Sequence, residues 1–156
     1  MIRVIVESPY AGDTLLHIAY ARACLRDCLE RGESPFASHL LYTQPGVLRD
    51  EVPAERVMGC EAGFSWREVA ELTVVYTDLG ISEGMRWGIE DAERKGHRVE
   101  YRTLPPAALA AVRRNPVAKG IHSIDVPRSE RRERHLERVE SDAEPIRSRR
   151  DGERRR

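Results

Sequence analysis

The sequence predicts an α/β fold in which helices cover a parallel β-sheet. Strand-like and helix-like segments alternate four times within about the first 112 residues, and this alternation is typical of parallel strands joined by helices. The chain has 156 residues, of which 40% are hydrophobic, so it can form one modest core. We expect one α/β domain over residues 1–114 and a charged, disordered tail over residues 115–156.

The first strand is predicted over residues 2–6, a run rich in β-branched side chains that suits a buried parallel strand. Turn-forming residues follow, and Asp13 is a good N-cap for a helix that Gly32 would end. Residues 34–42 are predicted to form a second strand that runs into a loop. These segments are the first half of a βαβ unit.

The middle of the chain is less regular. Residues 43–50 contain Pro45 and Gly46 and are expected to be a loop, whereas Pro53 suits the first turn of a helix that reaches about Ala70. The side chains expected to form a partial core on this helix are Val57, Cys60, Ala62, Phe64 and Val69.

The clearest strand covers residues 72–77, because its side chains are mostly β-branched or aromatic. Ser82 is a candidate N-cap for a helix that continues to Lys95. A further strand over residues 97–102 and a short helix over residues 105–112 complete the predicted domain.

Charge and cysteine content limit the class of protein. Residues 128–156 carry 11 Arg and 8 Asp or Glu, so a basic tail follows an acidic body although the whole chain is formally neutral. Because acids are interspersed with the arginines, we expect a solvated tail in which i, i+4 charge pairs favour a transient helix over residues 130–140. The alternative is a tail that binds nucleic acid through its arginines. The odd number of cysteines, without close pairing, argues against a disulfide framework, and we expect Cys24 and Cys28 to be buried thiols. With no signal peptide or membrane span expected, we predict a cytoplasmic protein without a membrane partner.

Three loops are expected beyond the carboxyl ends of the strands, where open parallel sheets bind their ligands: residues 7–13, 39–50 and 78–84. In the third loop, Asp78 ends a buried strand, where a carboxylate is costly unless a partner such as a sugar hydroxyl satisfies it. Gly80 and Gly84 would leave room for a ligand, and Ser82 could bind an anion together with the helix amides. Glu83 lies in the first turn, where the helix dipole favours an ionised, reactive carboxylate. The alternative is an ordinary helix start with a capping serine.

The other two loops contribute further candidates. Tyr10 could stack on a base or sugar, and Gly12 allows a ligand to approach the backbone closely. His39 could act as an acid or base, although a lone histidine is more often structural. The first loop could equally be a plain turn followed by a helix cap. Its polar side chains are Glu7, Ser8, Tyr10 and Asp13.

Several cofactor and enzyme classes have no signature here. The sequence contains neither a Walker A loop nor a GxGxxG motif, and it lacks the spacing of a hydrolase triad. The histidines are scattered, so we predict neither a metal nor a cofactor. They are His17, His39, His97, His122 and His135.

The strings VIVESPYAG (residues 4–12), AELTVVYTD (70–78) and SEGMRWGIEDA (82–92) resemble the nucleoside 2-deoxyribosyltransferase-like superfamily. The strings ASHLLYTQPG (37–46) and YTDLGISEG (76–84) are similar to a bacterial and phage branch of it. The resemblance covers about residues 2–102. It implies a Rossmann-like, flavodoxin-type three-layer sandwich around a small parallel sheet of four or five strands.

The resemblance also implies cleavage or transfer of an N-glycosidic bond by a carboxylate borne on a helix. When the helix is aligned through Gly84 and Ala92, that carboxylate falls on Gly88, and Glu83 lies one turn earlier and nearer the strand ends. We therefore predict Glu83 and Asp78 as the catalytic residues. The predicted substrate-binding residues are Ser8, Tyr10, Gly12, His39, Gly80, Ser82 and Gly84.

Three functional hypotheses follow. The first is a nucleoside- or nucleotide-processing enzyme of the deoxyribosyltransferase or N-hydrolase type, which the resemblance implies is a homo-oligomer. The second is a non-catalytic nucleotide-binding or sensing module that serves a phage or its host. The third is an interaction protein that acts through its tail.

Overall fold

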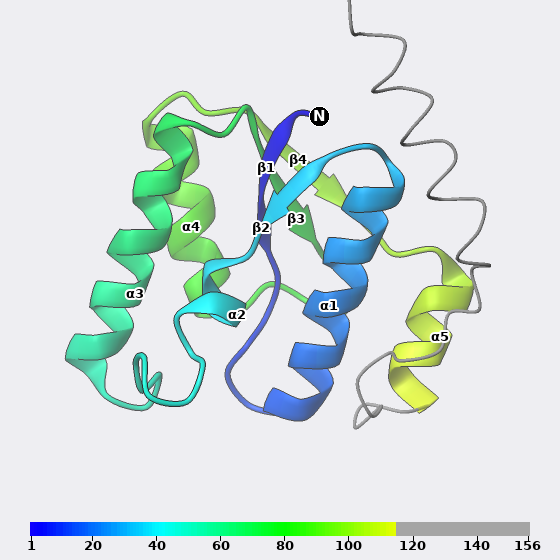
Figure 1. The fold of residues 1–156 in the computed structure, drawn as a ribbon, viewed down its shortest axis with the longest axis horizontal. Helices are drawn as coiled ribbons and strands as arrows, with labels where there is room; N and C mark the ends of the chain where they lie inside the picture. Colours follow the sequence, from blue (N-terminus) through cyan, green and yellow to red (C-terminus); the bar gives the residue numbers. More distant parts are fainter. Residues whose placement is uncertain (115–156) are drawn as a thin grey trace, which may run out of the picture. The chain divides into compact units, whose positions relative to one another are not determined.

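The computed structural model describes residues 1–114 and confirms the predicted α/β fold. Its sheet is parallel throughout and has the strand order β2-β1-β3-β4, as in a flavodoxin-type sheet that has four strands (Figure 1). The strands are β1 (Arg3–Glu7), β2 (Ser34–Phe36), β3 (Leu72–Tyr76) and β4 (Val99–Arg102). The predictions for the tail, including a helix over residues 130–140, lie outside the described residues.

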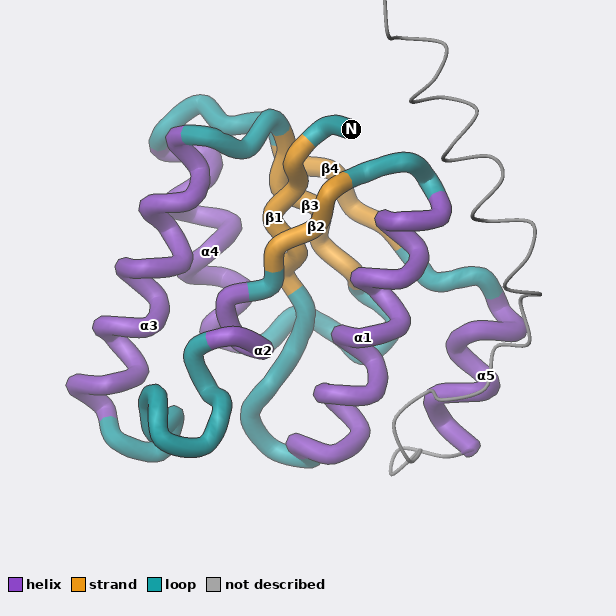
Figure 2. The backbone as a smooth tube through the Cα atoms, viewed as in Figure 1, coloured by secondary structure: helices purple, strands orange, loops and turns teal. Residues whose placement is uncertain are grey.

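Helices cover both faces of the sheet, which gives three layers (Figures 1 and 2). Helices α1 and α5 pack together on one face, and α3 and α4 pack together on the other, with α2 beside α3. The helices are α1 (Thr14–Glu30), α2 (Ser38–Leu41), α3 (Pro53–Ser65), α4 (Glu83–Arg94) and α5 (Pro106–Arg114), with a 3₁₀ turn, η1 (Trp66–Glu68), after α3.

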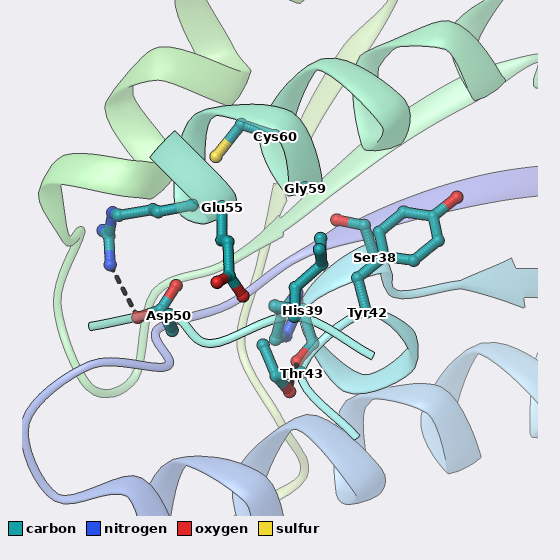
Figure 3. Close-up of a pocket in the computed structure, with 10 residues that line it drawn as sticks. Ser38, His39, Tyr42, Thr43, Asp50, Glu55, Gly59 and Cys60 are labelled. Atoms are coloured by element: carbon teal, nitrogen blue, oxygen red, sulfur yellow. Dashed lines mark hydrogen bonds and ion pairs between the residues drawn. The ribbon is translucent and has the colours of Figure 1, made fainter. Parts of the chain in front are cut away.

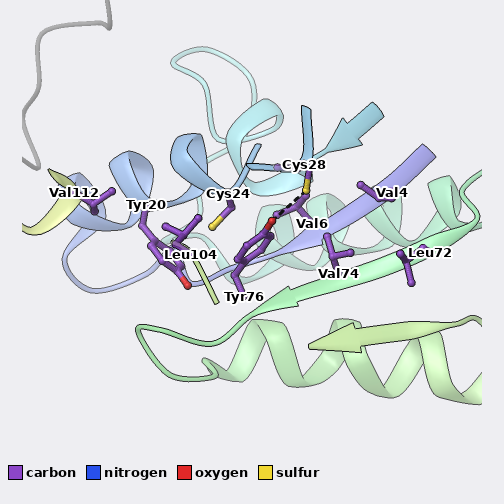
Figure 4. Close-up of a cluster of buried hydrophobic side chains, with 11 residues drawn as sticks. Val4, Val6, Tyr20, Cys24, Cys28, Leu72, Val74, Tyr76, Leu104 and Val112 are labelled. Atoms are coloured by element: carbon purple, nitrogen blue, oxygen red, sulfur yellow. Dashed lines mark hydrogen bonds between the residues drawn. The ribbon is translucent and has the colours of Figure 1, made fainter. Parts of the chain in front are cut away.

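The strand side chains alternate between two apolar clusters. Val6, Val74 and Tyr76 pack with the α1 thiols Cys24 and Cys28, both fully buried as predicted (Figure 4). On the opposite face, a smaller cluster joins Val75 of β3 to Met85 and Ile89 of α4. The smaller cluster leaves room beside α4 for the polar groups described below.

Local signals place the main helices where the sequence predicts them. Asp13 accepts a hydrogen bond from the backbone of Leu16 at the start of α1, and Ser82 accepts one from Met85 at the start of α4. Gly32 adopts φ 78°, the left-handed conformation that glycine allows after a helix.

Two predictions for the middle of the chain are wrong. The strand predicted over residues 34–42 ends at Phe36, because pairing with β1 extends over only three residues and the chain then turns into α2. Val57 and Val69 are both 47% exposed rather than part of the core. Helix α3 instead turns its small residues inward, since a Cβ on Gly63 would lie only 2.8 Å from Ser38.

Within residues 1–114, no helix combines the length and apolar character needed to cross a lipid bilayer.

Candidate functional site

A cavity of about 70 Å³, here called the inner cavity, lies where the loop after β1 meets α2, α3 and the start of α4. It brings together five residues that the sequence predicts as substrate-binding. These are Ser8, Tyr10, His39, Ser82 and Gly84. They come from three separate segments, namely the loop after β1 (Ser8 and Tyr10), helix α2 (His39) and the start of α4 (Ser82 and Gly84), so their convergence is a property of the fold and not of local sequence.

Two further pockets adjoin the inner cavity, and Asp50 and Arg56 line all three. A wide depression of about 600 Å³, the outer hollow, extends from Tyr10 and Gly12 to the irregular segment at residues 43–51. A side pocket of about 60 Å³ lies between α2 and the first turns of α3 (Figure 3). The outer hollow falls within the usual size range for small-molecule sites, whereas each smaller pocket could hold only part of a ligand.

Ser8 and His39 form a hydrogen-bonded pair at the wall of the inner cavity. The Ser8 hydroxyl lies 2.8 Å from His39 Nε2, and the Tyr10 ring meets the imidazole edge-on with 6.3 Å between centroids. Burial lowers the pKa of His39 to about 4, so its imidazole is neutral at physiological pH. A neutral imidazole can donate or accept hydrogen bonds but carries no charge towards an anion.

The first turn of α4 forms another wall. Ser82 caps the helix, and a Cβ on Gly84 would lie 3.2 Å from Arg56 Nη2, so the guanidinium lies against this turn. Arg56 also pairs with Asp50 at 2.7 Å and lies 5.8 Å from the centre of the Trp87 ring. A cation beside the amino end of a helix favours an anionic ligand group.

The other two predicted glycines differ in position. Gly12 lines the outer hollow and has φ 96°, a conformation that glycine adopts easily. Gly80 also has a positive φ of 82°, but it shapes the turn after β3 and lines none of the three pockets.

Asp78 lies away from the three pockets. Its Oδ2 accepts hydrogen bonds from the Tyr20 hydroxyl at 2.7 Å and from the Leu104 amide at 2.9 Å. The carboxylate at the end of β3 is thus satisfied by α1 and by the segment after β4. In the structure Asp78 links elements of the α1 and α5 face and has no contact with the cavity.

Glu83 is exposed in the first turn of α4 and lines none of the three pockets. The structure therefore does not bring the two predicted catalytic carboxylates together with Tyr10. The physical reason is rotation along the helix: Met85 and Gly88 face the sheet and are buried, whereas Glu83 is on the solvent side.

A different carboxylate, Glu7 at the end of β1, lines the inner cavity. Its side chain is 14% exposed, and its Oε1 accepts a hydrogen bond from Arg67 Nη2 at 2.9 Å. The carboxylate lies against Gly88, because a Cβ built there would come within 2.6 Å of the Glu7 carboxyl carbon. Only a glycine at position 88 leaves room for this arrangement.

Arg67 connects Glu7 to α4. Its side chain is 2% exposed and also donates to the Gly88 carbonyl at 2.7 Å and to Asp91 at 3.0 Å. Burial raises the pKa of Glu7 to about 7, against the opposing effect of the Arg67 guanidinium. Glu7 can therefore change its protonation state near neutral pH.

In the sequence, Glu7 is only one of several polar residues in the first loop, and no motif singles out Arg56 or Arg67. The available signal was Gly88, since a glycine in the interior of a helix is unfavourable and indicates that something must approach closely. Nothing in the sequence indicated that Glu7 is the group that approaches Gly88.

Within the described residues, no cluster of three or more His, Cys, Asp or Glu side chains is arranged to hold a metal ion.

The sheet order and the inner cavity define a Rossmann-like α/β protein with its pocket at the carboxyl edge of the sheet. Residues 2–102 match the family described as "Domain of unknown function (DUF7768)", and the chain belongs to this family. Comparisons with curated proteins and with solved structures found no match.

Proposed function

We propose that the protein is an enzyme that cleaves or transfers the N-glycosidic bond of a nucleoside or nucleotide. The observation that carries the proposal is the convergence of Ser8, Tyr10, His39, Ser82 and Gly84 on the inner cavity. The resemblance to nucleoside 2-deoxyribosyltransferase-like proteins motivates the reaction class, and the geometry supplies a pocket of suitable chemistry.

The pocket offers complementary groups for each part of a nucleotide. The Tyr10 ring can pack against a base or sugar, and the hydroxyls of Ser8 and Ser82 can bond to sugar hydroxyls. Arg56, beside the amino end of α4, suits a phosphate. The outer hollow has the volume for the parts of the ligand that the inner cavity cannot enclose.

Release of free base tests the proposal. The full chain is incubated with a panel of nucleosides and of ribo- and deoxynucleoside 5′-monophosphates, and free base is separated chromatographically and quantified. We expect release from at least one panel member. Arg56→Ala should weaken binding of monophosphates, whereas Arg98→Ala, at an arginine whose side chain is 74% exposed, is the matched control. Absence of release from every panel member would contradict the enzyme proposal.

The second candidate is a non-catalytic nucleotide-binding or sensing module. The observation that favours it is the position of Asp78 and Glu83 outside the inner cavity. The same panel separates the two functions. Thermal stabilisation by a nucleotide without base release would support the sensor and exclude the enzyme.

Two further properties belong to this proposal. Helix α3 exposes Val57 and Met58, with 47% and 57% of their surface accessible, and such apolar side chains favour association with a second copy of the chain. Light scattering coupled to size-exclusion chromatography measures the oligomeric state.

The three cysteines are free thiols, which supports a reducing compartment such as the cytoplasm.

A further inference from the structure

The carboxylates near the inner cavity are not equivalent. Glu7 and Asp50 both line it, but Asp50 pairs with Arg56, and its side chain is 27% exposed. Glu7 is 14% exposed and emerges from the end of a central strand. A charge acts most strongly where water is excluded, so Glu7 is the carboxylate with the larger electrostatic influence on a ligand.

The surroundings of Glu7 fix one carboxylate oxygen and leave the other free. Arg67 donates to Oε1, and no residue within 1–114 donates a hydrogen bond to Oε2. Arg67 cannot easily move, because it is buried and anchored to Asp91 and to the Gly88 carbonyl. A carboxylate held by one oxygen, with the other available, is already oriented before a substrate binds.

Gly88 is what allows the carboxylate to occupy this place. Any side chain at position 88 would overlap Glu7, so helix α4 supplies empty space where strand β1 supplies the acid. The strand therefore provides a carboxylate at the surface of α4 without using a side chain of that helix.

We propose that Glu7 is the catalytic carboxylate of the site, and that it stabilises positive charge at the anomeric carbon of the bound substrate while the bond to the base breaks. This inference rests on the proposed function. The bond between the anomeric carbon and the base nitrogen breaks, and its electron pair leaves with the base. Water adds to the anomeric carbon and loses one proton, and the base gains one, so hydrolysis is balanced; in transfer, the nitrogen of a second base takes the place of water.

The role requires the ionised form of Glu7, which fixes the sign of the pH dependence. Because the pKa of Glu7 is raised to about 7, the rate of base release should increase with pH and reach half its maximum near pH 7. His39 stays neutral across this range, since its pKa is about 4, and it does not produce the same transition.

The test uses the full chain and the best substrate of the panel. Glu7→Gln keeps the shape of the side chain and a hydrogen-bond acceptor for Arg67, but removes the charge. We expect it to reduce base release by on the order of 100- to 1,000-fold, as the loss of one electrostatic group does in other enzymes, and to abolish the transition near pH 7. Glu93→Gln, at an exposed position on α4, is the matched control and should keep the wild-type rate and pH profile.

The outcomes separate the two proposals. Wild-type protein that releases no base from any substrate contradicts the proposed function itself. If wild type is active and Glu7→Gln retains a rate within tenfold of it, the role of Glu7 is overturned but the proposed function is not. A rate that falls as pH rises through 7 also overturns it, because the protonated form would then be the active one. If the variant does not fold, the wild-type pH profile decides between these results.

Discussion

The carboxylate of Glu7 occupies the space into which a side chain at Gly88 would project. The two residues are far apart in the sequence and belong to different layers, yet each restricts the other. Glu7 needs the empty position on α4, and a glycine in the interior of that helix is otherwise unfavourable.

Gly88→Ala tests this relationship through stability. Alanine is the better helix former by about 1 kcal/mol, but its Cβ would force the Glu7 carboxylate away from Arg67. Overpacking of this kind costs about 1–3 kcal/mol, so we expect net destabilisation, measured by urea unfolding. Gly84→Ala is the matched control, because its Cβ would meet only the flexible end of Arg56 and should be neutral or stabilising. Equal stability changes in the two variants would contradict the assigned packing.

The pH dependence of stability reports on Glu7 independently of activity. Its pKa is about 7 in the folded state and near 4.5 when unfolded, so the folded state holds the proton more tightly. The resulting stabilisation is fully present below about pH 4.5 and is lost as pH rises through 7. Between pH 5 and 8, wild type should lose about 2–3 kcal/mol relative to Glu7→Gln. A difference between the two proteins that does not change with pH would show that Glu7 has an ordinary pKa.

His39 should contribute with the opposite sign. Burial lowers its pKa to about 4 from 6.5, so the unfolded state binds the proton more tightly, and stability is lost as pH falls below about 6.5. We expect wild type to lose about 2 kcal/mol between pH 7 and 5 relative to His39→Gln, which retains a partner for Ser8. The pH-dependent contributions of Glu7 and His39 to stability partly cancel in the wild type. Each contribution is therefore seen only by comparing wild type with the corresponding single variant. If the stability of wild type and of His39→Gln changed with pH in parallel, the lowered pKa of His39 would be contradicted.

The fold was predictable because its signals are local. The strand over residues 72–77 is defined by its own side chains, and the caps Asp13 and Ser82 act within one helical turn. Five of the residues that line the inner cavity were also predictable, because parallel strands direct the segments that follow them to one edge of the sheet.

The catalytic carboxylates were harder to place, because side-chain direction depends on packing. Asp78 follows a buried strand, but Tyr20 and Leu104 satisfy its carboxylate, and both are distant in sequence. Glu83 lies in the first turn of a helix, as predicted, but it projects from the solvent-facing side of that helix. The approach of Glu7 to Gly88 exists only after the sheet and α4 have packed.

Tyr20→Phe separates the structural role of Asp78 from substrate binding. The change removes the hydroxyl that donates to Asp78 at 2.7 Å and leaves the Leu104 amide in place. Loss of a hydrogen bond to a charged group should destabilise the fold by about 1.5–3 kcal/mol, measured by chemical denaturation. Nucleotide affinity, measured by calorimetry at a temperature where both proteins are folded, should be unchanged. A large loss of affinity with little change in stability would indicate that Asp78 acts in substrate binding after all.

Arg67 provides the most stringent test of the buried cluster. Arg67→Met removes the cation between Glu7 and Asp91. Above pH 7, where Glu7 is ionised in the wild type, breaking a buried ion pair in this way costs about 3–5 kcal/mol, because Glu7 must then either take up a proton or remain an unpaired charge. Asp91 keeps Arg94 and Lys95 as partners, so most of the effect should come from Glu7. Adding Glu7→Gln to Arg67→Met should therefore recover much of the lost stability, since a neutral amide needs no counter-charge. Urea unfolding of wild type, both single variants and the double variant measures the coupling. Strictly additive effects would show that Arg67 and Glu7 do not interact in the folded protein.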